Sequence, residues 1–173
     1  VWSFAPGGNP DGLALTAFSD VNDEASTFTG TAGEVYIVRW TISNGVCPVS
    51  TDDVQISISE DATVSVAGAP QTVCGSSTVL TANTPVIGTG TWTVDAGVGG
   101  SFVDVNDPTT TFNGVAGNSY TLRWTISNGV CAASFTTVAI NLQQTPTTAS
   151  AGADQNVCIT AGIPANLAAN AAV

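Results

Sequence analysis

The sequence predicts an all-β protein made of tandem sandwiches. Three observations support this prediction: an internal repeat, a hydrophobic period of two residues within each repeat, and a composition rich in Thr, Val and Ile. Such β-branched residues favour strands over helices. Hydrophobic residues make up 43% of the 173 residues, which is enough for each repeat to bury a core.

The repeat is seen most clearly in an octapeptide. Trp-Thr-Ile-Ser-Asn-Gly-Val-Cys occupies positions 40–47 and again positions 124–131, an offset of 124 − 40 = 84. The same offset holds without a gap from Phe18, which matches Phe102, to Cys74, which matches Cys158. The chain therefore contains two copies of one structural unit and the beginning of a third.

Each element of the second copy follows from local patterns. Short runs bounded by turn residues predict strands near 71–75, 78–82, 90–95, 109–113, 119–126 and 133–142. In the run 119–126, Tyr120, Leu122, Trp124 and Ile126 share one face. Asn128-Gly129 then predicts a hairpin turn that leads into the last strand. Short strands at this spacing are typical of a β-sandwich.

Two features make the predicted sandwich immunoglobulin-like. Trp92 and its counterpart Trp2 fit the buried tryptophan of the third strand, and Tyr120 and Tyr36 fit the tyrosine corner. The fold class is thus all-β, with tandem immunoglobulin-like β-sandwiches arranged end to end. We expect core positions for all four tryptophans, which are Trp2, Trp40, Trp92 and Trp124.

The repeat also predicts the domain organisation. We expect a sandwich without its first strands at 1–58, a linker at 59–70, a complete sandwich at 71–142, a linker at 143–151, and the first strands of a further sandwich at 152–173. The last assignment rests on the match of 80–83 with 167–170. Since the head lacks what the tail provides, we expect residues 152–173 to complete an adjacent copy. This completion occurs either by strand exchange between subunits or within one very long chain.

Composition excludes several functions. The chain has 13 acidic and 2 basic residues, a net charge of −11 and no His or Lys. It cannot neutralise a phosphate backbone, so nucleic-acid partners are not expected. Without His there is no Ser-His or Cys-His nucleophile pair, so we expect neither an enzyme nor a bound cofactor. No apolar run approaches the ~20 residues that span a bilayer, so membrane insertion is not expected.

Two sets of polar residues recur in both copies. Closely spaced oxygens are weak candidates for calcium ligands, and the alternative is an Asx turn in which these side chains bind their own backbone; they are Asp20, Asn22, Asp23, Asp104, Asn106 and Asp107. The two cations, Arg39 and Arg123, occupy equivalent outward positions. We expect each to pair with a carboxylate on a neighbouring strand, with Asp95 as the candidate for Arg123.

The four cysteines predict disulfides in an oxidising, extracellular setting. If the first and last strands of the sandwich begin at the same pole, Cys74 bonds Cys131 within the chain. By the same reasoning Cys47 bonds Cys158 of the adjacent copy. The alternative pairs Cys47 with Cys74 and Cys131 with Cys158, which would link each sandwich to the next.

The motifs together resemble a known family. They are Gly-Thr-Trp, Asp-x-Asn-Asp-Pro-Thr, Tyr-x-x-Arg-Trp-Thr-Ile-Ser-Asn-Gly-x-Cys and Ala-Gly-Ala-Asp-Gln-x-Val-Cys. This combination is similar to the PKD-like, Ig-like tandem repeats of very long secreted surface proteins of Bacteroidetes. The resemblance implies export by the type 9 system and a role as an adhesin or extracellular scaffold.

These observations lead to one functional hypothesis and two alternatives. The hypothesis is a structural and adhesive repeat segment of an extracellular filament or cell-surface stalk, whose partners are copies of itself arranged head to tail. The first alternative is a carbohydrate-binding module of a large secreted protein, which would bind surface glycans. The second is a spacer stiffened by calcium.

Overall fold

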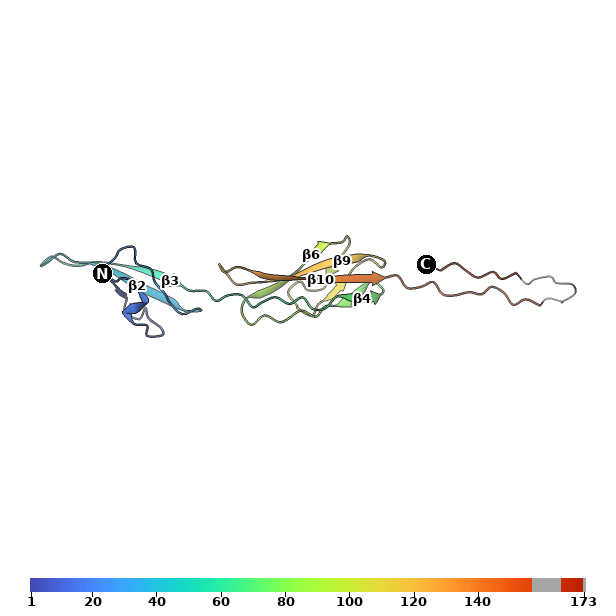
Figure 1. The fold of residues 1–173 in the computed structure, drawn as a ribbon, viewed down its shortest axis with the longest axis horizontal. Coiled ribbons are helices and arrows are strands. Elements are labelled where there is room, and N and C mark those ends of the chain that lie inside the picture. Colours follow the sequence, from blue (N-terminus) through green and yellow to red (C-terminus); the bar gives the residue numbers. More distant parts are fainter. Residues whose placement is uncertain (157–165, 173) are drawn as a thin grey trace. The chain divides into compact units, whose positions relative to one another are not determined.

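The computed structural model describes residues 1–156 and 166–172, and these residues form a nearly all-β protein (Figure 1). Among these described residues, the one helical element is a short 3-10 helix, Leu15–Ala17. The strands are β1 (Trp2–Phe4), β2 (Val35–Ile42), β3 (Ser50–Ser57), β4 (Gln71–Cys74), β5 (Ser77–Val79), β6 (Thr89–Ala96), β7 (Ser101–Phe102), β8 (Thr111–Asn113), β9 (Ser119–Ser127) and β10 (Ser134–Gln143).

The chain divides into two compact units. Unit 1 contains Val1–Val64, Pro85–Thr89 and Ile126–Ser134. Unit 2 contains Ser65–Thr84, Gly90–Thr125 and Phe135–Val173. Both units therefore combine segments that are distant in the sequence.

Unit 1 is built on one antiparallel sheet with the strand order β1-β2-β3. Trp2 lies opposite Trp40 in the pairing of β1 with β2, and Val38 lies opposite Val54 in the pairing of β2 with β3. An isolated bridge pairs Phe18 with Phe28, and the rings of both contact Phe4 of β1. The buried residues Phe18, Tyr36 and Val38 form the centre of this core.

Unit 2 contains two sheets. One has the order β4-β10-β9-β6 and the other has the order β5-β8-β7. The ring of Phe112 on β8 lies 4.9 Å from that of Tyr120 on β9, so the two sheets share one core. The large, fully buried side chains of this core include Trp92, Trp124, Phe112, Leu80, Leu122, Ile140 and Leu142. The alternating burial of β9 confirms the two-residue period in the sequence.

The strand positions predicted for the second repeat agree with β4, β5, β6, β8, β9 and β10, while β7 was not predicted. The predicted linker at 59–70 differs in part from the structure. Ser65 and Ala67 are buried, with 2% and 4% of their surfaces exposed. The hydroxyl of Ser65 donates a hydrogen bond to the carbonyl oxygen of Trp124 at 2.7 Å. This polar anchoring was not visible in the sequence, because Ser and Ala are also common in linkers.

Candidate functional site: an uncovered groove and an exposed hairpin

The two units contain the same pair of contacting tryptophans. The ring centroids of Trp92 and Trp124 lie 5.1 Å apart in unit 2, and those of Trp2 and Trp40 lie 5.0 Å apart in unit 1. The indole NH groups of Trp92 and Trp2 donate to the carbonyl oxygens of Asp107 and Asp23. The repeat is therefore structural as well as sequential.

The predicted tyrosine corner is present in both units. The Tyr120 hydroxyl accepts a hydrogen bond from the backbone NH of Val115 at 2.7 Å. The Tyr36 hydroxyl accepts one from the backbone NH of Thr31 at 2.8 Å. Each tyrosine thus fixes the loop that precedes its strand.

The units differ in how well their equivalent residues are covered. Trp124 is fully buried, but its counterpart Trp40 is only half-buried. Val138 is 3% exposed, whereas its counterpart Val54 is 46% exposed. Since the equivalent residues are identical in type, the difference arises from what lies over them and not from the strands themselves.

In unit 2 the cover is supplied by residues 65–83. The backbone NH of Leu80 donates to the carbonyl oxygen of Thr110 at 2.9 Å, and the Leu80 side chain is fully buried. The carbonyl oxygen of Asn83 accepts a hydrogen bond from the Trp124 indole at 3.2 Å. Among the described residues, none accepts a hydrogen bond from the Trp40 indole.

Unit 1 has a groove at the corresponding place. One hollow of about 60 Å³ is lined by Trp2, Phe18, Ser26, Phe28, Val38, Val54 and Ile56. A second, of about 240 Å³, shares two of these residues and is lined by Trp2, Glu24, Trp40, Asp52, Asp53 and Val54. We call the two together the receptor groove. The adjoining strand β3 is an edge strand, and none of its residues is buried.

The C-terminal residues form a second exposed feature. Residues 144–156 and 166–172, which we call the C-terminal hairpin, run side by side as two extended arms (Figure 1). The Ser150 NH donates to the Asn170 side-chain oxygen at 2.7 Å, and the Asn170 NH donates to the Ser150 carbonyl at 3.1 Å. Val66 and Asn83 form the same two bonds in unit 2, at 2.8 and 3.0 Å. The hairpin therefore shares this pair of hydrogen bonds with the segment that covers the core of unit 2.

The hairpin differs from its counterpart in burial. Every described residue of the hairpin is exposed. Leu167 is 90% exposed, whereas its counterpart Leu80 is 0% exposed. An isolated two-stranded hairpin with an exposed apolar residue is only marginally stable in water, so it gains from a surface to pack on.

Both arginines pair with aspartates on neighbouring strands. Arg123 binds Asp95 with a shortest N–O distance of 2.6 Å, as predicted. Arg39 binds Asp53 on β3 through two hydrogen bonds of 2.7 and 2.9 Å, and this ion pair lowers the pKa of Asp53. Arg123 also lies 4.4 Å over the ring of Phe135, a contact that the sequence analysis missed.

The acidic loops form Asx turns. The side chains of Asp20 and Asp104 accept hydrogen bonds from the backbone NH groups two residues later, at 2.8 and 2.9 Å. Asp107 accepts the backbone NH and the hydroxyl of Thr109, and these bonds lower its pKa. No group of three or more candidate metal-ligating acids, cysteines or histidines occurs in the described part of the chain.

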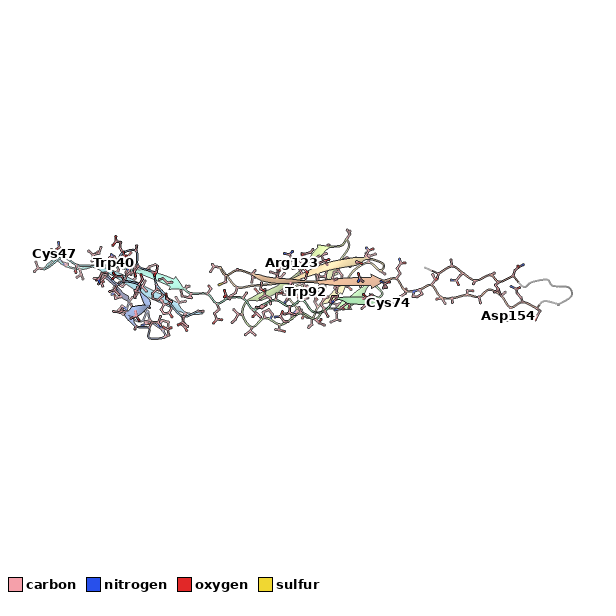
Figure 2. All side chains as sticks on the ribbon, viewed as in Figure 1. Trp40, Cys47, Cys74, Trp92, Arg123 and Asp154 are labelled. Carbon is pink, nitrogen blue, oxygen red and sulfur yellow. The ribbon has the colours of Figure 1, made fainter. Side chains whose placement is uncertain are left out.

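The strand register separates Cys74 from Cys131, which were predicted to bond, and the structure has no disulfide between them. Parallel pairing of β4 with β10 places Cys74 opposite Gln143, the last residue of β10. Figure 2 shows Cys74 near that end of the strand. Cys131 lies before the start of β10, where its NH donates to the Asn128 carbonyl. The ten residues of β10 separate the two cysteines by about 30 Å at ~3.3 Å per residue, far beyond disulfide reach. Cys158 lies outside the described residues, so its pairing stays a prediction.

No family model matches the chain, and no curated protein matches it. In the described residues, no helix has both the length and the hydropathy needed to cross a bilayer.

Proposed function

We propose that the protein is a non-catalytic, structural and adhesive repeat segment of an extracellular filament or cell-surface stalk, in which consecutive copies join head to tail. The C-terminal hairpin of one copy fills the receptor groove of the next, as a separate subunit or as the next period of a continuous chain. The observation that carries the proposal is the pair of equivalents Leu80, fully buried, and Leu167, 90% exposed.

Unit 2 provides the template for this docking. An offset of 84 takes Thr110 to Ser26, so the NH of Leu167 would donate to the Ser26 carbonyl, as that of Leu80 does to Thr110. Ser26 lines the receptor groove. In the same way the carbonyl oxygen of Asn170 would accept the hydrogen bond of the Trp40 indole.

In the proposed contact, the hairpin arm 144–156 is also added as a strand to the edge of β3. Gln71 pairs with Ile140 in the parallel ladder of β4 and β10. The offset of 84 takes this pair to Gln155 and Ile56, so Gln155 would lie opposite Ile56 on the exposed edge of β3. Adding a strand satisfies backbone groups on that edge and gives the sandwich its missing cover.

The energetics favour docking. Burying the Leu167 side chain contributes about 1.5–3 kcal/mol, and the half-exposed Val54 and Trp40 add further apolar area. The hairpin is already held by the bonds between Ser150 and Asn170, which reduces the entropy lost on binding. A chain with only 9% charged residues also has a surface suited to close contact with neighbouring copies.

We propose that the units are immunoglobulin-like, PKD-like sandwiches of a secreted Bacteroidetes surface protein. The sheet orders, the two tyrosine corners and the recurring tryptophans support this proposal. The cysteines, joined as disulfides, would suit an oxidising, extracellular location.

Two variants of the 173-residue chain test the head-to-tail contact. Leu167→Asp disables the hairpin but leaves the groove intact, and Val54→Asp disables the groove but leaves the hairpin intact. Wild-type protein should form a concentration-dependent ladder in light scattering after size-exclusion chromatography. Each variant alone should be monomeric, and their equimolar mixture should form a heterodimer and no larger species, because only one junction is available.

The matched control is Val103→Asp, which changes a 74% exposed valine outside the groove and the hairpin, and should leave the ladder intact. Circular dichroism checks that each variant is folded. A wild-type chain that stays monomeric at high concentration, or a mixture that gains no dimer, would overturn the proposal.

One observation favours the alternative of glycan binding. The larger hollow of the receptor groove places Trp2 and Trp40 beside Glu24, Asp52 and Asp53, and aromatic rings with nearby carboxylates can bind sugars. A glycan array distinguishes the two functions. Binding that is lost in Trp40→Ala and unaffected by Leu167→Asp would support a carbohydrate-binding module.

A further inference from the structure

We propose that each junction between consecutive copies is locked by a disulfide between Cys74 of one copy and Cys47 of the next. This inference rests on the head-to-tail assembly proposed above. It also replaces the in-chain bond that the strand pairing excludes.

The first step is the position of Cys74 at its own end of unit 2. The register of β4 with β10 places Cys74 opposite Gln143. Gln143 is the last residue of β10, and the chain continues directly into the C-terminal hairpin at Gln144. The exposed Cys74 thiol therefore lies beside the base of the hairpin that enters the next copy (Figure 2).

The second step is a hydrogen bond in unit 1 that holds the chain just before the covering residues 65–83. The side-chain amide of Asn128 donates a hydrogen bond to the carbonyl oxygen of Glu60 at 2.8 Å. The carbonyl of the same Asn128 accepts the NH of Cys131 at 3.1 Å. Glu60, which precedes the covering residues 65–83, is thus bound by the turn that carries Cys131.

The third step transfers this contact to the junction. The offset of 84 takes Asn128 to Asn44 and Glu60 to Gln144. Asn44 has the same local geometry as Asn128, because its carbonyl accepts the NH of Cys47 at 3.1 Å. When the hairpin docks like its counterpart, Asn44 of the next copy binds Gln144.

The junction therefore brings two exposed thiols together. Cys74 is the ladder neighbour of the residue before Gln144, and Cys47 lies in the turn that binds Gln144. Neither thiol is shielded, since both cysteines are exposed. The same offset pairs Cys131 with Cys158 of the preceding copy, and this pairing replaces the predicted bond between Cys47 and Cys158. Cys158 itself lies outside the described residues.

The bond forms by thiol–disulfide exchange with a small-molecule disulfide such as oxidised glutathione. The Cys74 thiolate attacks the oxidant and releases one glutathione thiol, and the Cys47 thiolate then displaces the second. The two cysteines lose two electrons and two protons in total. The oxidant takes up both and becomes two molecules of glutathione.

The experiment separates this bond from the assembly itself. Chains labelled with ¹⁵N and unlabelled chains are mixed and first assembled in dithiothreitol, where light scattering reports the non-covalent contact. They are then transferred to oxidised glutathione, digested with pepsin at acid pH, and analysed by mass spectrometry without reduction. The expected product is a linked peptide pair of mixed isotope that contains Cys74 and Cys47.

Matched serine variants provide the control. Cys131→Ser should still give a covalent ladder on a non-reducing gel, whereas Cys131→Ser combined with Cys74→Ser should give none. Both should assemble equally in dithiothreitol. Assembly with Cys74 unlinked, linked to another cysteine, or linked to Cys47 within one isotope only would overturn this inference and leave the proposed function intact. Loss of assembly in dithiothreitol would refute the proposed function and this inference with it.

Discussion

The hydroxyl of Tyr36 donates a hydrogen bond to the carboxylate of Asp11 at 2.7 Å. Its counterpart in unit 2, Tyr120, donates instead to the backbone carbonyl of Val98 at 2.9 Å. The same corner therefore depends on a titratable group in unit 1 and on a neutral group in unit 2. Asp11 was not a candidate in the sequence analysis, because it has no counterpart in the other repeat: the segment from Trp2 to Phe18 spans 16 positions, six more than the 10 from Trp92 to Phe102.

Asp11 should make the stability of unit 1 dependent on pH. Hydrogen bonds from Thr31 and then Tyr36 lower the pKa of Asp11 below its ordinary value of 3.8. A lowered pKa in the folded state means that the carboxylate stabilises the fold above about pH 4, and that this contribution is lost as the pH falls through the folded value. Asp11→Asn should therefore be less stable than wild type at pH 7, with a smaller difference at pH 3.

Urea denaturation followed by tryptophan fluorescence measures this difference at both pH values. The matched control is Asp61→Asn, because Asp61 is an exposed aspartate in the same unit. An equal loss of stability for Asp11→Asn at both pH values would contradict the assignment.

Tyr120→Phe should destabilise unit 2 by about 1–3 kcal/mol. The substitution removes the acceptor of the Val115 NH and leaves that donor without its partner, in a core where Tyr120 is 2% exposed. Chemical denaturation measures the change in the free energy of unfolding. A loss below about 0.5 kcal/mol would show that water replaces the hydroxyl.

Arg123→Ala should lower the free energy of unfolding by about 1 kcal/mol, and part of this loss should persist in 1 M salt. The ion pair with Asp95 is screened by salt, but the contact with the Phe135 ring also involves packing. Arg39→Ala removes an ion pair with Asp53 and should show a smaller, more salt-sensitive effect. Denaturation of both variants at low and high salt tests this contrast, and equal salt sensitivity would argue against the Phe135 contact.

Gly90→Ala should destabilise unit 2 by about 1–3 kcal/mol, the usual cost of overpacking a core. A methyl group at this position would collide with the indole ring of Trp124, which is fully buried and cannot move aside. Thr89→Ala, at the exposed neighbouring position of β6, is the control and should have a much smaller effect. Thermal melting of the two variants gives the comparison.

Calcium should have no effect on thermal stability. The carboxylates of Asp20, Asp104 and Asp107 already accept hydrogen bonds from their own loops. Scanning calorimetry with excess calcium and with a chelator tests this expectation. A melting temperature that falls with the chelator would restore the hypothesis of a spacer stiffened by calcium.

The position of Cys74 relative to Cys131 could not be predicted from the sequence. The offset of 84 identified Cys47 with Cys131 and Cys74 with Cys158 as equivalents. It did not reveal that β4 runs parallel to β10, which moves Cys74 to the far end of that strand. Parallel and antiparallel neighbours have the same hydrophobic period, so no local pattern distinguishes them. The in-chain pairing therefore failed while the repeat itself held.

The sequence alone determined the repeat, the strand positions, the tyrosine corners and the pairing of Arg123 with Asp95. Each of these depends on local periodicity or on a motif that occurs twice. The cover over the core of unit 2, the receptor groove and the place of each thiol were decided only by the tertiary structure. Leu80 and Leu167 are matched by aligning 80–83 with 167–170, three residues beyond the repeat offset of 84, yet one is buried and the other exposed. Burial is a property of what packs against a side chain, and that depends on contacts between residues far apart in the chain.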